Sequence, residues 1–202
     1  MPSDASRARV MAKLVPALER LMDRYDTFTE VSVEALMSEA GMSRRSFYAY
    51  FEDKGQLMTE VAAEVIGQMV NSWQVWWDRA PRVTLQDLDL ALADMVTVYH
   101  PHRRLLRAVA ETTTYDPRVA EVYNSGLRQV AERLGAYIAA GQTEGVIRPQ
   151  LDPSTAATWL TVLLSTGLAH LAAAPSDEHD HHLAAAREIL WRVLYLPELD
   201  RS

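Results

Sequence analysis

The sequence predicts an all-α protein of about nine helices, with a small N-terminal domain over residues 1–62 and a larger helical domain over residues 63–202. Three observations support this fold class. Hydrophobic residues make up 49% of the 202 residues, which is enough for a substantial core. Apolar side chains recur at spacings of three and four along most of the chain. Few stretches alternate apolar with polar residues, so strands are not expected.

Composition narrows the classes of function. The chain has no cysteine, which excludes disulfides and thiolate zinc sites. Its first residues, MPSDASRARV, lack the apolar run of a signal peptide, and no apolar stretch is long enough to span a membrane. We therefore expect a cytoplasmic protein without a membrane segment. The net charge of −7 argues mildly against nucleic acid, but basic residues cluster locally.

The stretch from Val31 to Lys54 organises the chain, because it predicts a helix-turn-helix. Ser32 is a plausible N-cap for a first short helix. Gly41 follows the last apolar residue of that helix, where a left-handed residue usually ends it. Ser43 is placed to cap a second helix over residues 44–50, so only three residues separate the two helices. The apolar face of the first helix comprises Val33, Leu36, Met37 and Ala40.

The second helix carries two contrasting faces. Its aromatic face, which can anchor it to the preceding helices, comprises Phe47, Tyr50 and Phe51. Arg44, Arg45 and Tyr48 point the other way. Two arginines in a first helical turn oppose the helix dipole, an arrangement that makes sense if they face an anion such as DNA phosphate. A solvated arginine pair on a surface helix is the alternative, and the surrounding turn and caps favour DNA.

The segment GMSRRSFYAYFEDKGQL resembles the DNA-reading part of the TetR family of transcriptional regulators. The resemblance covers about residues 7 to 66. The rest of the chain is similar in length and helical rhythm, with a looser likeness to the ethionamide-resistance repressors. The matching positions are Gly41, Ser43, Phe47, Tyr48, Tyr50, Phe51, Lys54 and Leu57.

The resemblance implies a set of DNA contacts. It places Tyr48 at a base edge or phosphate and Tyr50 and Lys54 at phosphates. Glu52 and Asp53 depart from a purely basic surface and should weaken binding beside Lys54. The full set of expected DNA-binding residues is Ser43, Arg44, Arg45, Ser46, Tyr48, Tyr50 and Lys54.

The N-terminal region permits two interpretations. Residues 1–6 are expected to form a tail before a helix over residues 7–25. Pro16 either bends this helix or marks its true start. Arg7 and Arg9 form either a minor-groove arm, as the family suggests, or part of a solvated tail.

Later helices are expected over residues 56–79, 85–99, 103–113, 117–144, 154–174 and 183–196. His100, Pro101 and His102 are interpreted as a turn between two of them. Neither these histidines nor the polar segment 176–182 has a spacing that suits a metal, and we expect no metal or cofactor.

A small apolar or amphipathic effector is implied mainly by the resemblance. Aromatic side chains and a methionine in the larger domain are candidates to line its site, although helical spacing is also typical of core packing. The candidate ligand-binding residues are Trp73, Trp77, Met95, Tyr99, Tyr123 and Trp159.

The last two helices predict a homodimer. The helix over residues 154–174 is apolar nearly all round, and two helices from each of two subunits would cover it in a four-helix bundle. The alternative is the central helix of a monomeric bundle.

Together these features predict a ligand-responsive transcriptional regulator rather than an enzyme. It would be a repressor that binds a palindromic double-stranded DNA operator as a homodimer, and an effector bound in the larger domain would release it through the helix over residues 56–79. The alternative is an all-α small-molecule-binding protein or enzyme without DNA binding, but the sequence holds no nucleophile elbow, phosphate loop or zinc spacing.

Overall fold

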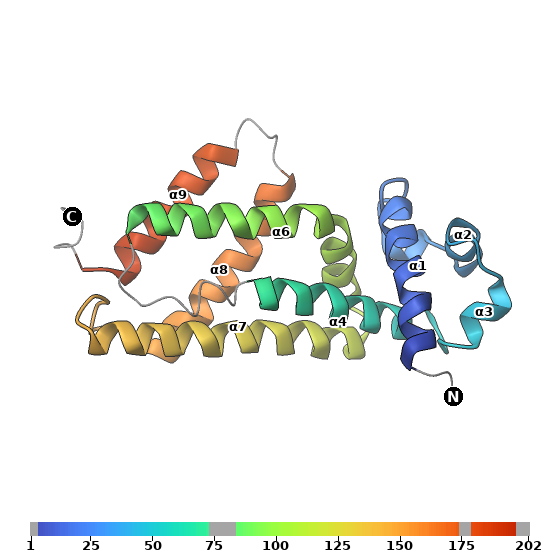
Figure 1. Ribbon diagram of the computed structural model, residues 1–202, viewed down its shortest axis with the longest axis horizontal. Helices are drawn as coiled ribbons and strands as arrows, with labels where there is room; N and C mark the ends of the chain where they lie inside the picture. Colours follow the sequence, from blue (N-terminus) through green and yellow to red (C-terminus); the bar gives the residue numbers. More distant parts are fainter. Residues whose placement is uncertain (1–3, 73–83, 174–178, 197–202) are drawn as a thin grey trace. The chain divides into compact units, whose positions relative to one another are not determined.

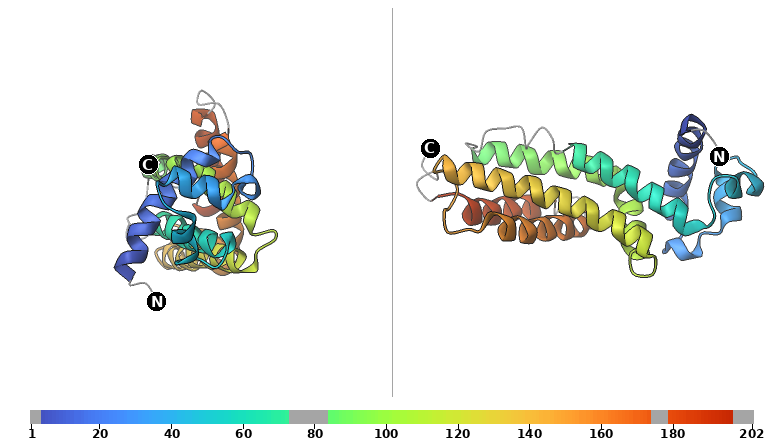
Figure 2. Two further views of the ribbon diagram at one scale, coloured as in Figure 1. Left: turned by 90° about the vertical axis from the view of Figure 1, so that its right-hand side faces the viewer. Right: turned by 90° about the horizontal axis from the view of Figure 1, so that it is seen from below.

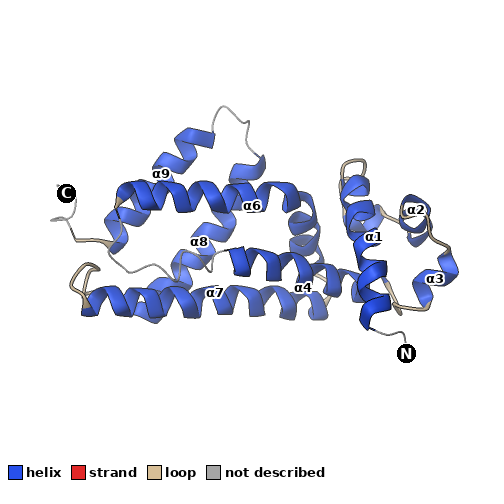
Figure 3. Cartoon of the chain, viewed as in Figure 1, coloured by secondary structure: helices blue, strands red, loops and turns tan. Residues whose placement is uncertain are grey.

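A computed structural model describes residues 4–72, 84–173 and 179–196. Within these ranges the regular structure consists of eight α-helices and one short 3-10 helix (Figure 3). An antiparallel bridge joins Ile147 to Tyr195. The all-α prediction is confirmed.

Figure 1 shows the helices coloured in chain order. The elements are α1 (Asp4–Met22), η1 (Phe28–Glu30), α2 (Val33–Glu39), α3 (Arg44–Tyr48), α4 (Lys54–Ser72), α6 (Leu85–Thr112), α7 (Pro117–Thr143), α8 (Pro153–Ala173) and α9 (His179–Leu194).

The chain forms two compact units. The first, here called the head unit, combines residues 1–67 with residues 102–125. The second, the body unit, combines residues 68–101 with residues 126–202. Helices α4, α6 and α7 contribute residues to both units. The head unit therefore takes in a segment from the middle of the chain that a division at residue 62 assigns elsewhere.

The helix-turn-helix has the predicted caps and turn. The Ser32 hydroxyl accepts a hydrogen bond from the backbone N–H of Ala35, and the Ser43 hydroxyl accepts one from that of Ser46. Gly41 has a φ of +65°, the left-handed conformation that ends α2. In this unit α2 packs against both α1 and α3.

Two prolines lie inside helices that continue through them. α1 begins at Asp4, earlier than predicted, and runs past Pro16. α6 runs past Pro101, so the turn predicted at residues 100–102 is wrong. Each proline removes one backbone hydrogen bond to the residue four positions earlier. Those residues, Ala12 and Thr97, are exposed like the prolines themselves, so water can satisfy the freed carbonyl groups.

The last helix also begins earlier than predicted. α9 starts at His179, within the segment that the sequence assigned to a polar linker. Asp180 lies in the first turn, where a negative charge interacts favourably with the helix dipole. The His182 ring packs edge-on against His170 of α8, with ring centroids 5.7 Å apart. This contact places the ends of α8 and α9 side by side.

The body unit is a two-layer arrangement of helices. α8 and α9 lie in one layer against α7 and the first part of α6 (Figure 2). Tyr137 of α7 and Tyr195 hydrogen-bond through their buried hydroxyls at 2.9 Å, and burial raises the pKa of the Tyr195 phenol. Across the described ranges, no helix has the length and apolarity that a membrane span requires.

Candidate nucleic-acid interface

Helix α3 presents a small basic and aromatic face. Arg44 and Arg45 are exposed, and the Tyr48 ring is 53% exposed. The Arg44 guanidinium lies over the Tyr48 ring at 5.9 Å from its centroid. Guanidinium and phenol groups donate hydrogen bonds to phosphates and to base edges. This face therefore has the chemistry that DNA reading requires.

The opposite side of α3 anchors it. Phe47 is fully buried and packs against Phe51, with ring centroids 5.3 Å apart. The hydroxyls of Ser43 and Ser46 hydrogen-bond to each other at 2.8 Å next to the cap. Ser43 thus fixes the start of the helix, and the arginine pair follows immediately.

Tyr50 and the N-terminal helix are joined by a hydrogen bond. The Tyr50 ring is half-buried, and its hydroxyl lies 2.6 Å from the Ser6 hydroxyl. Arg7 does not form a free arm, because it lies inside α1 and makes an ion pair with Glu60 of α4. Arg9 is also part of α1, and its Nε donates to the Ala5 carbonyl. The arm interpretation of these two arginines is therefore wrong.

Lys54 occupies a carbonyl cage at the start of α4. Its Nζ donates to the backbone carbonyls of Phe28, Thr29 and Val31 at 3.1, 3.1 and 2.6 Å. It also lies 4.7 Å from the centroid of the Phe28 ring. Burial lowers the pKa of this ammonium. Because three carbonyls match its three donors, the group ties α4 to the segment before α2 and is poorly placed to reach a phosphate.

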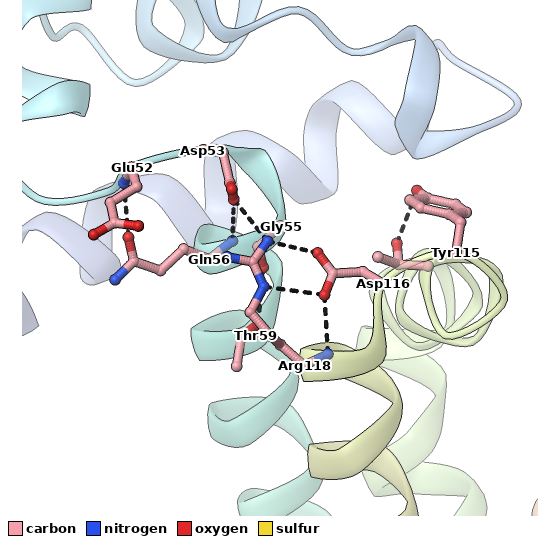
Figure 4. A network of polar contacts seen from close by, with 9 residues as sticks. Glu52, Asp53, Gly55, Gln56, Thr59, Tyr115, Asp116 and Arg118 are labelled. Carbon is pink, nitrogen blue, oxygen red and sulfur yellow. Dashed lines mark hydrogen bonds and ion pairs between the residues drawn. The ribbon is translucent and has the colours of Figure 1, made fainter.

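The negative charge expected next to Lys54 is partly compensated. Arg118 of α7 makes an ion pair with Asp53 at 2.9 Å. The same guanidinium binds Asp116, which precedes α7 (Figure 4). The role of Arg118 is not apparent from the sequence. Asp116-Pro117 is typical of a helix start, but no local pattern links Arg118 to a carboxylate 65 positions earlier.

Other contacts connect the second part of α6 to the segment between α1 and α2. The Arg104 and Arg107 guanidinium groups donate to the carbonyls of Met22 and Asp26 at 3.3 and 3.1 Å. Glu111 accepts a hydrogen bond from the Phe28 backbone N–H at 3.3 Å. These contacts explain why residues 102–125 belong to the head unit.

The candidate ligand residues are not all brought together. Met95 and Tyr99 are buried one helical turn apart on α6 in the body unit. Tyr123 is half-buried and belongs to the head unit. Trp73 and Trp77 lie outside the described residues.

Trp159 does not share the interior position of Met95 and Tyr99. Its indole is 71% exposed, because it lies on the opposite face of α8 from the buried Ala157 and Thr161. Within the described ranges, no group of three or more histidine and acidic side chains is placed to hold a metal. His102 instead contacts Glu19 through its Nδ1 at 3.1 Å.

The helix-turn-helix segment is similar to a known protein family. Residues 27–61, which span η1 to the first part of α4, match the family described as "Bacterial regulatory proteins, tetR family". No curated protein matches the chain.

Solved structures show the same fold over nearly the whole length. Salmonella enterica GusR is 16% identical, with a TM-score of 0.72 and coverage of 92% of this chain and 95% of that one. A regulator from Saccharomonospora viridis in complex with choline is 16% identical, with a TM-score of 0.73 and coverage of 94% and 99%. A TetR family regulator from Pseudomonas syringae pv. tomato is 23% identical, with a TM-score of 0.65 and coverage of 97% and 100%.

Proposed function

We propose that this chain is a DNA-binding transcriptional regulator of the TetR family, and that it acts as a ligand-responsive repressor that binds a palindromic operator as a homodimer. The match of residues 27–61 to that family supports the proposal. The observation that carries this proposal is the capped α3 helix, which exposes Arg44, Arg45 and Tyr48 on one face and buries Phe47 on the other. The match to a family of regulatory proteins also supports the expectation that the chain is not an enzyme.

We propose that the residues expected to contact DNA have different roles. Arg44, Arg45 and Tyr48 are exposed and supply the donors for bases and phosphates. Ser43 and Ser46 lie at the first turn of α3, where their linked hydroxyls are close to the arginines. Tyr50 offers its hydroxyl at the junction with α1. We assign Lys54 a supporting role, because its ammonium is held by backbone carbonyls.

We assign dimerisation to α8 and α9. Large apolar side chains are exposed on both helices: Trp159, Val162, Leu163, Ile189 and Val193. Their spacings of three and four put the residues of each helix on one face. An apolar surface of this kind is typical of a protein–protein interface, and two helices from each subunit form a four-helix bundle. Two recognition helices are then available for half-sites about 34 Å apart or a multiple of that distance.

The effector part of the proposal has indirect support. The regulator from Saccharomonospora viridis was determined in complex with choline, so a protein of this fold takes up a small molecule. In the present chain Met95 and Tyr99 supply buried apolar and aromatic surface on α6. We propose that the effector binds near them and that helices α4, α6 and α7, which continue from the body unit into the head unit, carry its effect.

Selection from random DNA tests the DNA-binding part. Purified protein is mixed with a pool of random duplexes, and bound sequences are recovered and sequenced. We expect an inverted repeat, because a two-fold symmetric dimer reads the same half-site twice. Recovery of no common sequence, from protein shown to be folded and dimeric, would contradict the proposal.

Release by an effector is tested separately. Choline and a series of small amphipathic amines are added to the complex with selected DNA, and tryptophan fluorescence is followed in parallel. We expect at least one compound to quench fluorescence and release DNA at the same concentrations, because both respond to one binding event. Release without any saturable change in fluorescence would argue against a site in the body unit.

A further inference from the structure

The first residues of α4 connect the helix-turn-helix to the rest of the head unit. Lys54 binds the backbone carbonyls that precede α2, as described above. Asp53, one position earlier, accepts a hydrogen bond from the Gln56 backbone N–H at 2.7 Å and so caps α4. Only residues 49–52 separate Asp53 from the end of α3. A short segment therefore connects the capped start of α4 to the end of α3.

A second cap lies beside the first. Asp116 precedes α7, and its Oδ1 accepts a hydrogen bond from the backbone N–H of Arg118 at 3.0 Å. Its side chain is only 12% exposed. Asp53 and Asp116 thus cap two helices that begin at the same place in the head unit (Figure 4).

Arg118 joins the two caps. Its Nη2 donates to Asp53 Oδ1 at 2.9 Å and to Asp116 Oδ2 at 2.7 Å, and its Nε donates to Asp116 Oδ1 at 3.1 Å. The guanidinium fork fixes both distance and direction, unlike a lysine at the same place. An arginine in the first turn of a helix opposes the helix dipole, and the two carboxylates offset that cost.

The backbone of α4 leaves room for this arrangement only because of a glycine. A Cβ on Gly55 would lie 2.0 Å from Asp116 Oδ2 and 2.2 Å from Arg118 Nη2. Any larger residue there must displace the side chains that form the ion pairs. Gly67, farther along the same helix, has no atom within 4 Å of the corresponding position. The close approach is therefore particular to the start of α4.

We infer that Arg118 is a positioning residue for DNA recognition, which holds the start of α4, and with it α3, against the connection between α6 and α7. This inference rests on the proposed function. The guanidinium acts through Asp53 and makes no contact with DNA in this account. A change in the connection between α6 and α7 would then alter DNA affinity through Arg118 and Asp53.

Binding of the selected DNA to Arg118→Gln provides the first test. The glutamine cannot bridge two carboxylates, so α4 is no longer fixed and Asp53 is left without its partner. We expect the dissociation constant to rise by about tenfold, within the range known for mutations that alter coupling. The dependence on salt should keep the wild-type slope, because no phosphate contact is lost. Arg118→Lys should restore part of the affinity, because it restores the charge but not the fork.

Two glycine variants provide a test that leaves every charge in place. Gly55→Ala must open the ion pairs and should weaken DNA binding as Arg118→Gln does. Gly67→Ala is the matched control in the same helix and should bind DNA like the wild type. Circular dichroism melting of each variant establishes that the helices are intact.

The possible failures can be distinguished. If the wild type binds no selected DNA, the proposed function fails. If it binds and Arg118→Gln binds equally well, the inference is overturned. A fall in affinity accompanied by a loss of about one unit of salt slope would also overturn it, because that result indicates a direct phosphate contact.

Discussion

The head unit and the body unit each have an apolar core, but they differ in the contacts added to that core and in the surface that is left exposed. In the head unit, charged side chains from distant segments bind backbone carbonyls and helix caps, as Lys54 and Arg118 do. In the body unit, long helices pack through apolar faces, and α8 and α9 leave large apolar side chains exposed. Hydrogen bonds and ion pairs are directional, whereas burial of apolar surface is not. The difference suggests that the head fixes a geometry and the body provides a surface for association.

A charge introduced on the exposed apolar face of α8 should have the largest measurable effect, because it should disrupt the proposed dimer. Leu163→Glu places one carboxylate from each subunit in the proposed dimer interface, where both lose water. We expect the dimer dissociation constant to rise by roughly a hundredfold or more. Analytical ultracentrifugation measures the change. Leu90→Glu, at an equally exposed position on α6, should leave the dimer intact. A stable Leu163→Glu dimer would place the interface elsewhere.

Loss of the carbonyl cage should weaken the head unit itself. Lys54→Met keeps the aliphatic length but leaves three carbonyls without their charged donor. We expect a loss of about 2 kcal/mol in the free energy of unfolding, as for hydrogen bonds to a charged group. Urea denaturation gives this value, and Lys13→Met on the exposed face of α1 is the control. If the two variants were equally stable, the cage would have no structural role and Lys54 would be available for phosphate.

Variants of the two serine caps distinguish an effect on stability from an effect on DNA affinity. Ser32→Ala and Ser43→Ala each remove a side-chain cap and should each lower the free energy of unfolding by about 1 kcal/mol. Only Ser43 stands beside the arginine pair, so only Ser43→Ala should also weaken DNA binding. Fluorescence anisotropy below the unfolding range makes the comparison. An equal loss of affinity in both variants would mean that affinity merely follows stability.

The smallest effect is expected on acidification. Hydrogen bonds from Arg118 lower the pKa of both Asp53 and Asp116. Their contribution is therefore complete above the ordinary aspartate pKa of about 3.9 and is lost as the pH falls through the lower folded values. Because Asp53 and Arg118 are exposed, we expect a difference near the detection limit. Urea denaturation at about pH 5 and about pH 3 should show a larger loss in wild type than in Asp53→Asn/Arg118→Gln. A larger loss in the variant would contradict these assignments.

Much of the head unit was predictable because its signals are local. Ser32, Gly41 and Ser43 set two caps and a left-handed turn within a dozen residues, and each needs only its own neighbours. The exposure of Arg44 and Arg45 follows from their place on the helix opposite Phe47. The arginine pair within this turn already favoured DNA binding. The family resemblance supported that expectation and implied a phosphate contact for Lys54, which its hydrogen bonds to three backbone carbonyls do not favour.

Other features could not be predicted because they depend on distant partners or on solvent. Pro101 was expected to end a helix, but exposure of the freed carbonyl lets α6 continue. Arg118 carries no motif, and its partner Asp53 is brought near only by the fold. Trp159 fits a helical apolar pattern equally well as a ligand wall or as part of an interface, and only its exposure separates the two.

The salt dependence of DNA binding tests the central claim that α3 is the reading helix. Selected DNA is titrated with wild type and with Arg44→Ala/Arg45→Ala at about 50 mM and about 200 mM salt. Arg20→Ala/Arg24→Ala serves as the control, because these exposed arginines pair with Glu39 elsewhere in the head unit. The account predicts a loss of affinity of about a hundredfold in Arg44→Ala/Arg45→Ala and little change in the control. Equal affinity and equal salt dependence in all three proteins would show that α3 is only a structural helix.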